Sequence, residues 1–458
     1  MNIKQAKQEI TNTLKAYLAK DQLGNYLIPT VRQRPVLLMG PPGVGKTQIM
    51  EQIAAETGVG LVAYTITHHT RQSAIGLPFI EKRTYGGEEV SVTEYTMSEI
   101  LSSVYRLMER TGLQEGILFL DEINCVSETL APMMLQFLQC KTFGNQALPE
   151  GWLIVAAGNP PEYNKSVRDF DVVTLDRVKR IDVEEDYGVW KEYARRKNLH
   201  GAILSYLDIK KDNFYRIENT ADGLQFATAR GWEDLSELLY AYETLGIRAD
   251  REVVGQYIQM PRIAKDFANY LEMFYKYQKT YHVEGILSGT WENITVLELR
   301  EAPFDEKLSV MGLVLSRLSE EARNTRCQDA LTDALHTSLT EFREKIADAP
   351  PLTVLDQLLW KRRTAMKQAK EAGQLDKESR DLKQREINAL EDYRQRLDRE
   401  AVAPEGAMDA VRGWFGEEVE RRKAVAMETK DMFDNAFRFL ETTFGDSQEL
   451  VIFVTEIT

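Results

Sequence analysis

The chain has 458 residues, of which 57 are Lys or Arg and 71 are Asp or Glu, so its formal net charge is −14. This length predicts two to four domains. Hydrophobic residues at 43% and charged residues at 28% are globular values, which exclude a disordered tail, a collagen and a membrane protein. No apolar run approaches the ~20 residues that span a bilayer, so we expect a cytoplasmic protein with no membrane partner. The acidic total also argues against general nucleic-acid binding.

Short apolar runs alternate with helical patterns over residues 1–187. The first run, Val36-Leu37-Leu38-Met39, leads directly into Gly40, as buried parallel strands do before a turn. Further apolar runs lie at residues 61–66, 116–120, 153–157 and 181–183. Alternating strands and helices are typical of an α/β fold, so the sequence predicts a parallel sheet in this segment.

The sequence after residue 187 has a largely helical pattern. We expect a helical lid domain over residues 188–285, a less regular connecting region over residues 286–350 and a mainly α-helical C-terminal domain over residues 351–458. In this last segment, residues 361–400 include 21 charged residues, 12 basic and 9 acidic, which is typical of one long polar helix with a solvated face or of part of a coiled-coil hairpin. The alternative is an arm that docks a partner protein. We expect a turn at Pro404-Glu405-Gly406, after which a further helix folds back as a hairpin.

A glycine-rich stretch follows the first predicted strand. Its sequence, Gly40-Pro41-Pro42-Gly43-Val44-Gly45-Lys46-Thr47, fits G-x-x-x-x-G-K-[ST] and precedes a predicted helix, which is the context of a phosphate-binding loop. Backbone N–H groups of such a loop wrap phosphate oxygens, the lysine bridges the β- and γ-phosphates, and the threonine hydroxyl binds Mg²⁺. A glycine-rich turn without a ligand is the alternative. The candidate nucleotide-binding residues are Gly40, Pro42, Gly43, Val44, Gly45, Lys46, Thr47 and Gln48.

Two carboxylates end another predicted strand. Residues 117–120 are apolar and are followed directly by Asp121 and Glu122. Ligands bind at the carboxyl ends of strands in open α/β sheets, so the pair is expected at the ligand-binding edge of the sheet. There Asp121 would hold Mg²⁺, while Glu122 would polarise the attacking water as the general base. An exposed acidic turn is the alternative, but the intact glutamate favours hydrolysis over nucleotide binding alone.

A family resemblance rests on five segments of the chain. They are the phosphate-binding loop, the Asp121-Glu122 pair, a third strand that ends in Asn159, the stretch Leu175-Asp176-Arg177-Val178, and the stretch Ala227-Thr228-Ala229-Arg230-Gly231-Trp232-Glu233. Together they resemble an AAA+ ATPase of the MoxR group, over about residues 25–275. The resemblance implies a P-loop AAA+ core with a helical lid, which uses ATP and Mg²⁺. Asn159 then matches the first sensor, which orients water near the γ-phosphate; the alternative is a loop asparagine before Pro160.

The resemblance also implies a catalytic arginine that is supplied by a neighbouring subunit. Arg177 matches this arginine finger, whose guanidinium stabilises transition-state charge at the neighbour's γ-phosphate. The alternative is a surface arginine paired with Asp176 or Asp182, and Arg180 is a rival position for the finger.

A second arginine lies in the predicted lid. Arg230 matches the second sensor, which reaches from the lid to the phosphates in its own subunit. The alternative is an arginine at a helix start that pairs with Glu233.

One subunit is catalytically incomplete if a neighbour supplies its arginine. The resemblance therefore implies a ring, most often of six subunits, that works with a separate von Willebrand A-domain protein to remodel or mature a target that the sequence does not identify. Two alternatives stay open: a nucleic-acid motor or nucleotide-dependent restriction-type NTPase subunit on the same core, and a nucleotide-gated scaffold. The net charge argues against the first, and intact Glu122 and Asn159 argue against the second.

A hairpin is predicted within residues 79–95, where two alternating segments flank Gly86-Gly87. In AAA+ relatives this part of the chain faces the central pore, so we hypothesise that Phe79 and the hairpin touch the remodelled protein. The alternative is a hairpin that covers a sheet edge.

Two adjacent histidines, His68 and His69, lie just upstream of the hairpin. Neighbouring side chains on a strand point to opposite faces, so these two cannot both reach one ion and no transition-metal site is expected there.

Overall fold

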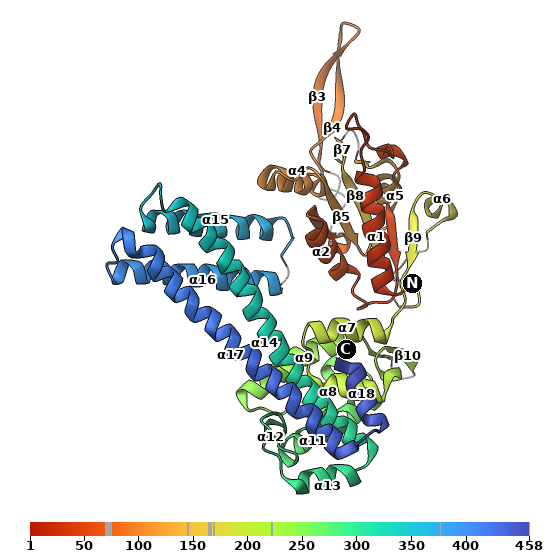
Figure 1. The fold of residues 1–458 in the computed structure, drawn as a ribbon. Coiled ribbons are helices and arrows are strands. Elements are labelled where there is room, and N and C mark those ends of the chain that lie inside the picture. Colours follow the sequence, from red (N-terminus) through yellow and green to blue (C-terminus); the bar gives the residue numbers. More distant parts are fainter. Residues whose placement is uncertain are drawn as a thin grey trace. The chain divides into compact units, whose positions relative to one another are not determined.

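The computed structural model of the chain describes residues 1–68, 76–143, 146–163, 167, 170–220, 223–375 and 377–457. By their contacts these residues form two compact units, whose elements are labelled in Figure 1. The first unit comprises Met1–Asp186 and Arg363–Arg380, and the second comprises Tyr187–Arg362 and Asp381–Thr458. Over the described part of the chain, no helix has the length and apolar character needed to cross a membrane.

The first unit contains a five-stranded sheet. Its strands are, in order across the sheet, β2 (Gly60–Thr65), β5 (Gly116–Asp121), β8 (Trp152–Gly158), β1 (Val36–Met39) and β9 (Lys179–Asp182). Every neighbouring pair is parallel, so the five carboxyl ends meet at one edge of the sheet. The predicted α/β fold with a parallel sheet is confirmed.

Helices cover both faces of this sheet. They are α1 (Ile3–Leu18), α2 (Lys46–Thr57), α4 (Glu99–Thr111), α5 (Ala131–Cys140) and the short α6 (Val172–Leu175). One cluster of buried side chains joins α1 and α2 to Val36 and Phe119, and another joins α4 and α5 to Leu37 and Leu118. Successive strand residues point to opposite faces, so a strand that is covered on both faces must be apolar throughout. This is why the strands could be recognised as short continuous apolar runs.

The predicted hairpin is confirmed as β3 (Pro78–Tyr85) and β4 (Glu88–Tyr95), which pair antiparallel. Gly86 and Gly87 form the turn with φ of 64° and 92°, values that glycine adopts without steric cost. Figure 1 shows the hairpin as a long ribbon that extends beyond the sheet, and all residues of β3 are exposed. A second, shorter hairpin pairs β6 (Thr142–Phe143) with β7 (Gln146–Ala147). His69 lies outside the described residues.

The second unit is built largely from helices. They are α7 (Tyr187–Arg196), α8 (Gly201–Ile209), α9 (Ala229–Leu245), α10 (Arg251–Tyr257), α11 (Pro261–Thr280), α12 (Val283–Leu287), α13 (Asn293–Glu301), α14 (Phe304–Lys345), most of α15 (Pro351–Glu371) and α16 (Lys377–Arg399), α17 (Ala407–Phe444) and α18 (Gln448–Ile457), with a ribbon of β10 (Arg216–Thr220) and β11 (Gly223–Ala227). One apolar core, centred on residues such as Trp232 and Phe267, joins α8, α9, α11, α14 and α17. The predicted helical character of this part is confirmed.

The expectation of a less regular region over residues 286–350 is wrong. It contains α14, a helix of 42 residues that packs along α17. The buried side chains of α14 fall in two groups, from Ser309 to Leu318 and from Thr332 to Phe342, with partly or fully exposed residues between them. No single apolar stripe therefore runs through the helix, and the sequence shows no continuous helical period.

The expectation of one long polar helix over residues 361–400 is also wrong. α15 ends at Glu371 and α16 begins at Lys377, with Gly373 between them at φ 70°. α16 buries Ile387, Leu390 and Leu397, so only part of its surface is solvated. The expected turn at Pro404–Gly406 is confirmed as a single 3-10 turn before α17.

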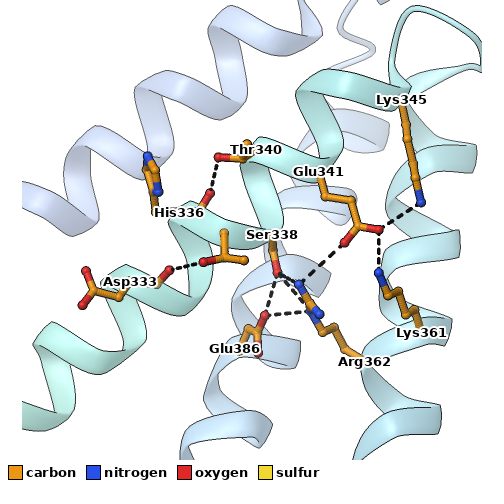
Figure 2. Close-up of polar contacts among 10 residues, drawn as sticks. Asp333, His336, Ser338, Thr340, Glu341, Lys345, Lys361, Arg362 and Glu386 are labelled. Atoms are coloured by element: carbon orange, nitrogen blue, oxygen red, sulfur yellow. Dashed lines mark hydrogen bonds and ion pairs between the residues drawn. The ribbon is translucent and has the colours of Figure 1, made fainter.

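A buried polar network joins α14, α15 and α16 (Figure 2). The hydroxyl of Ser338 donates to Glu386 Oε1 at 2.6 Å and accepts from Arg362 Nη2 at 2.9 Å, while Arg362 Nε lies 3.0 Å from the same carboxylate oxygen. Ser338 is fully buried and Glu386 is 8% exposed. Because an unpaired buried charge is costly, this network favours one register among the three helices.

Candidate nucleotide-binding and hydrolysis site

Residues 40–45 turn the chain from β1 into α2. Gly43 and Gly45 have φ of 78° and 92°, which residues with a side chain rarely adopt. Gly45 is the N-cap of α2, and no side chain caps the first N–H groups of the helix. The first N–H groups of α2 and the positive end of the helix dipole therefore meet at this loop, which is an arrangement that binds phosphate.

Position 40 needs a glycine because there is no room for a Cβ atom. A Cβ atom added there would lie 2.7 Å from the carbonyl oxygen of Val183 and 3.1 Å from its Cβ. Val183 follows β9 and donates its N–H to the carbonyl of Met39 at 2.7 Å, so the end of β9 supports the start of the loop. Among the other loop candidates, Pro42 and Val44 are half-buried, while Gln48 is exposed in the first turn of α2.

Lys46 is buried at the carboxyl edge of the sheet, with 8% of its surface exposed. Its ammonium donates to the carbonyl oxygens of Gly40 at 2.7 Å and Pro41 at 2.9 Å, and to Oδ1 of Asn159 at 2.8 Å. These three acceptors come from the loop and from the residue after β8. The ammonium is therefore held between the phosphate-binding loop and the end of β8, the two places where the sequence predicts contacts near the phosphates.

Thr47 and Asp121 lie side by side, as expected for two ligands of one metal. The Thr47 hydroxyl donates to Oδ2 of Asp121 at 3.1 Å. Hydroxyl and carboxylate oxygens are the hard ligands that Mg²⁺ prefers, and Mg²⁺ usually takes its remaining ligands from phosphates and water. The donor set therefore fits Mg²⁺ bound together with ATP, with Thr47 and Asp121 as its protein ligands.

Glu122 has a strained backbone, with φ of 58°. Non-glycine residues in this region cost free energy and are concentrated at functional sites. Its N–H donates to Oδ1 of Asp121 at 2.9 Å, and its Oε2 accepts the hydroxyl of Thr67 at 2.8 Å. Thr67 follows β2, at the same edge of the sheet, and was not among the sequence candidates. The available signal was its place as a polar residue just after a strand of this sheet.

Asn159 lies directly after β8 and reaches Lys46, as described above. Its main-chain oxygen accepts Nδ2 of Asn124 at 2.7 Å. Asn124 is a second residue that sequence reasoning missed, because a contact over 35 positions depends on how β5 and β8 pair.

Of the two candidate arginines, Arg177 belongs to the same unit as this cluster but lies outside it. Arg177 precedes β9, is exposed, and donates to Oε1 of Gln139 on α5. The rival, Arg180, pairs instead with Asp182 at 2.8 Å. Arg230 belongs to the second unit, where it is exposed in the first turn of α9, next to the N-cap Thr228.

Residues 35–178 match the family model of the AAA domain, dynein-related subfamily. The chain carries an AAA+ ATPase domain. The matched range includes the phosphate-binding loop, Asp121, Glu122, Asn159 and Arg177, and it ends before Arg230. A comparison with curated proteins found no match.

The side chains at this edge of the AAA+ domain have the chemistry that ATP hydrolysis requires. When bound, Mg²⁺ neutralises charge that develops on the β- and γ-phosphates. Lys46 places a fixed positive charge at the mouth of the loop, where it can exchange carbonyl acceptors for phosphate oxygens. Glu122 holds a carboxylate oxygen at the same edge, which is the kind of acceptor that a general base requires. The hydrogen bond from Thr67 limits how far the Glu122 carboxylate can turn.

Proposed function

We propose that this chain is a MoxR-type AAA+ ATPase that assembles as a ring, most simply a hexamer, and uses ATP hydrolysis to remodel or mature a partner protein. In this proposal Arg177 completes the site of the neighbouring subunit, Arg230 senses the nucleotide from the lid of its own subunit, and a separate von Willebrand A-domain protein presents the target. The observation that carries the proposal is the place of Arg177, just before β9.

Arg177 lies at the end of the sheet opposite to the phosphate-binding loop. β9 and β1 run parallel with Lys179 beside Val36, so Gly40 lies four residues beyond the level of Lys179, while Arg177 lies in the turn that leads into β9 at Lys179. At ~3.3 Å per residue, Gly40 is about 13 Å from the level of Lys179 along the strand direction. This is more than an arginine side chain can span, so Arg177 cannot act on the nucleotide of its own subunit. Its exposed position leaves it available to a neighbour.

The β3–β4 hairpin supports contact with another protein. It exposes large apolar side chains, including Phe79 at 45%, Ile80 at 76% and Tyr85 at 57%. An isolated two-stranded hairpin is at best marginally stable in water, and neighbouring exposed apolar residues commonly mark binding surfaces. We assign Phe79 and the hairpin to the contact with the remodelled protein.

Hydrolysis measurements test this proposal against the nucleic-acid alternative. The assembled protein is expected to keep its ATPase rate within about twofold when duplex DNA, single-stranded DNA or RNA is added, and to respond to an unfolded protein probe such as casein. Stimulation by a nucleic acid several-fold above the basal rate would support a nucleic-acid motor instead.

The hairpin assignment has a matched control on the same ribbon. Phe79→Ala is expected to keep basal hydrolysis and to lose the response to casein, whereas Thr93→Ala on the neighbouring strand, an exposed polar position, should keep both. If Phe79→Ala lowered basal hydrolysis as well, the hairpin would have a structural role and not a substrate-binding one.

A further inference from the structure

Asn124 is a buried polar residue that connects the two halves of the hydrolysis site. It is 2% exposed and lies in the turn after β5, two residues beyond Glu122. The main chain of the turn makes two hydrogen bonds of its own: the N–H of Ile123 donates to the carbonyl of Ala157 on β8 at 2.9 Å, and the N–H of Cys125 donates to that of Glu122 within the turn at 2.9 Å. The Asn124 side chain is therefore not needed to close the turn.

The two ends of the Asn124 amide have different surroundings. Nδ2 donates to the main-chain oxygen of Asn159 at 2.7 Å. Oδ1 is buried and, over the described residues, has no hydrogen-bond partner. It lies against Gly158, where an added Cβ would be 2.6 Å from it. A buried acceptor without a partner is unfavourable, and a leucine of similar shape would avoid it. The N–H group is thus the part of this side chain that makes a favourable contact.

This N–H group holds the main chain of Asn159, the residue whose side chain contacts the lysine. The main chain of Asn159 is held by Asn124, and its side-chain Oδ1 accepts the ammonium of Lys46 at 2.8 Å. Asn159 therefore links the turn that carries Glu122 to the phosphate-binding loop, with its main chain bonded to Asn124 and its side chain bonded to Lys46. Any rotation of the main chain at Asn159 would move its Oδ1 relative to both Glu122 and Lys46.

We propose that Asn124 is a positioning residue for ATP hydrolysis, which fixes Asn159 at the distance and angle that its role near the γ-phosphate requires. The inference rests on the role proposed above for Asn159. It assigns to Asn124 no contact with ATP, so nucleotide affinity should depend on it weakly and the chemical step strongly. Gly158 has the supporting task of leaving room for the Asn124 amide.

The test is Asn124→Leu, which keeps the size of the side chain and removes both the donor and the unpartnered oxygen. Its melting temperature should equal or exceed that of the wild type. The kcat for ATP should fall about 10- to 100-fold, as misplacement of a positioned group by less than 1 Å does, with KM unchanged within about threefold. Gly158→Ala, which displaces the amide, should reproduce the fall in kcat. An unchanged kcat in Asn124→Leu, or a loss that appears only in KM, would overturn the inference.

A double-mutant cycle separates this inference from the role of Asn159. In an Asn159→Ala background, which keeps the main-chain oxygen, Asn124→Leu should change kcat by less than about twofold, because the positioned amide is gone. Suppose that Asn159→Ala lowers kcat and that Asn124→Leu lowers kcat in this background by the same factor as in the wild type. Asn124 then does not act through Asn159, and this inference fails while the role proposed for Asn159 stands. If Asn159→Ala keeps the wild-type kcat, the role proposed for Asn159 fails, and this inference fails with it.

Discussion

The space around Gly40 gives a sharp prediction about nucleotide binding. In Gly40→Ala the new Cβ would lie 2.7 Å from the oxygen of Val183, where an ordinary carbon–oxygen contact is about 3.3 Å. A displacement of roughly 0.6 Å is therefore needed. The clash is with main chain, and Val183 is tied to Met39 by a hydrogen bond of 2.7 Å, so no side-chain rotation relieves it.

The displacement must be taken up by the phosphate-binding loop. The carbonyl of Gly40 accepts the Lys46 ammonium at 2.7 Å, so a shift of the loop moves both the backbone N–H groups and the lysine. Overpacking of this kind typically costs about 1–3 kcal/mol. If the cost falls on the bound state, the dissociation constant for ATP rises about 5- to 150-fold, since 1.4 kcal/mol corresponds to a factor of ten.

Titration with a fluorescent ATP analogue, together with the melting temperature, measures this effect. Gly255→Ala in α10 is the matched control, because no atom lies within 4 Å of its added Cβ and alanine favours a helix by about 1 kcal/mol. The control should bind like the wild type and unfold at the same or a higher temperature. If Gly40→Ala also bound ATP with a dissociation constant within twofold of the wild type, the steric argument for Gly40 would be refuted.

Three further predictions concern catalysis, stability and pH. Glu122→Gln should bind ATP like the wild type but lose about 10²–10⁴-fold in kcat, since a general base contributes that much; a full rate in a coupled-enzyme assay would exclude this role. Glu386→Ala leaves Arg362 without its buried partner and should cost about 2–4 kcal/mol in denaturant unfolding, less than for full burial because that arginine is 23% exposed; an unchanged midpoint would contradict the network. The hydrogen bond from Lys361 lowers the pKa of Glu341 below its usual 4.5, so this pair stabilises the fold above that pH and the gain is lost on acidification; Glu341→Gln should flatten the acid side of the stability curve.

The parts of the fold that the sequence revealed are those with local causes. The phosphate-binding loop is eight consecutive residues whose glycines, lysine and threonine each have a fixed task, so it could be recognised together with its strand and helix. The strands were visible because helices on both faces of the sheet force them to be apolar throughout. Asp121 could be placed because the end of a parallel strand is a known ligand-binding position.

The contacts that the sequence did not reveal depend on which segments pair in space. Asn124 and Asn159 meet because β5 lies beside β8, and Thr67 reaches Glu122 because β2 lies beside β5. Neither neighbour relation is encoded in a short motif. α14 was missed for another reason: only the first of its two buried groups belongs to the apolar core around Trp232, and partly or fully exposed residues separate the two groups, so no continuous apolar face runs along the helix.

Mixing two inactive variants tests the central claim, that a complete hydrolysis site needs Arg177 from a neighbouring subunit. Arg177→Ala keeps Glu122, and Glu122→Gln keeps Arg177, so each supplies the half-site that the other lacks. Each variant alone should assemble, bind ATP and hydrolyse it at a small fraction of the wild-type rate. In random mixed rings with equal amounts of both, roughly one interface in four carries both residues, so about a quarter of the wild-type rate should return. A mixture that co-assembles by mass photometry and stays inactive would contradict the assignment.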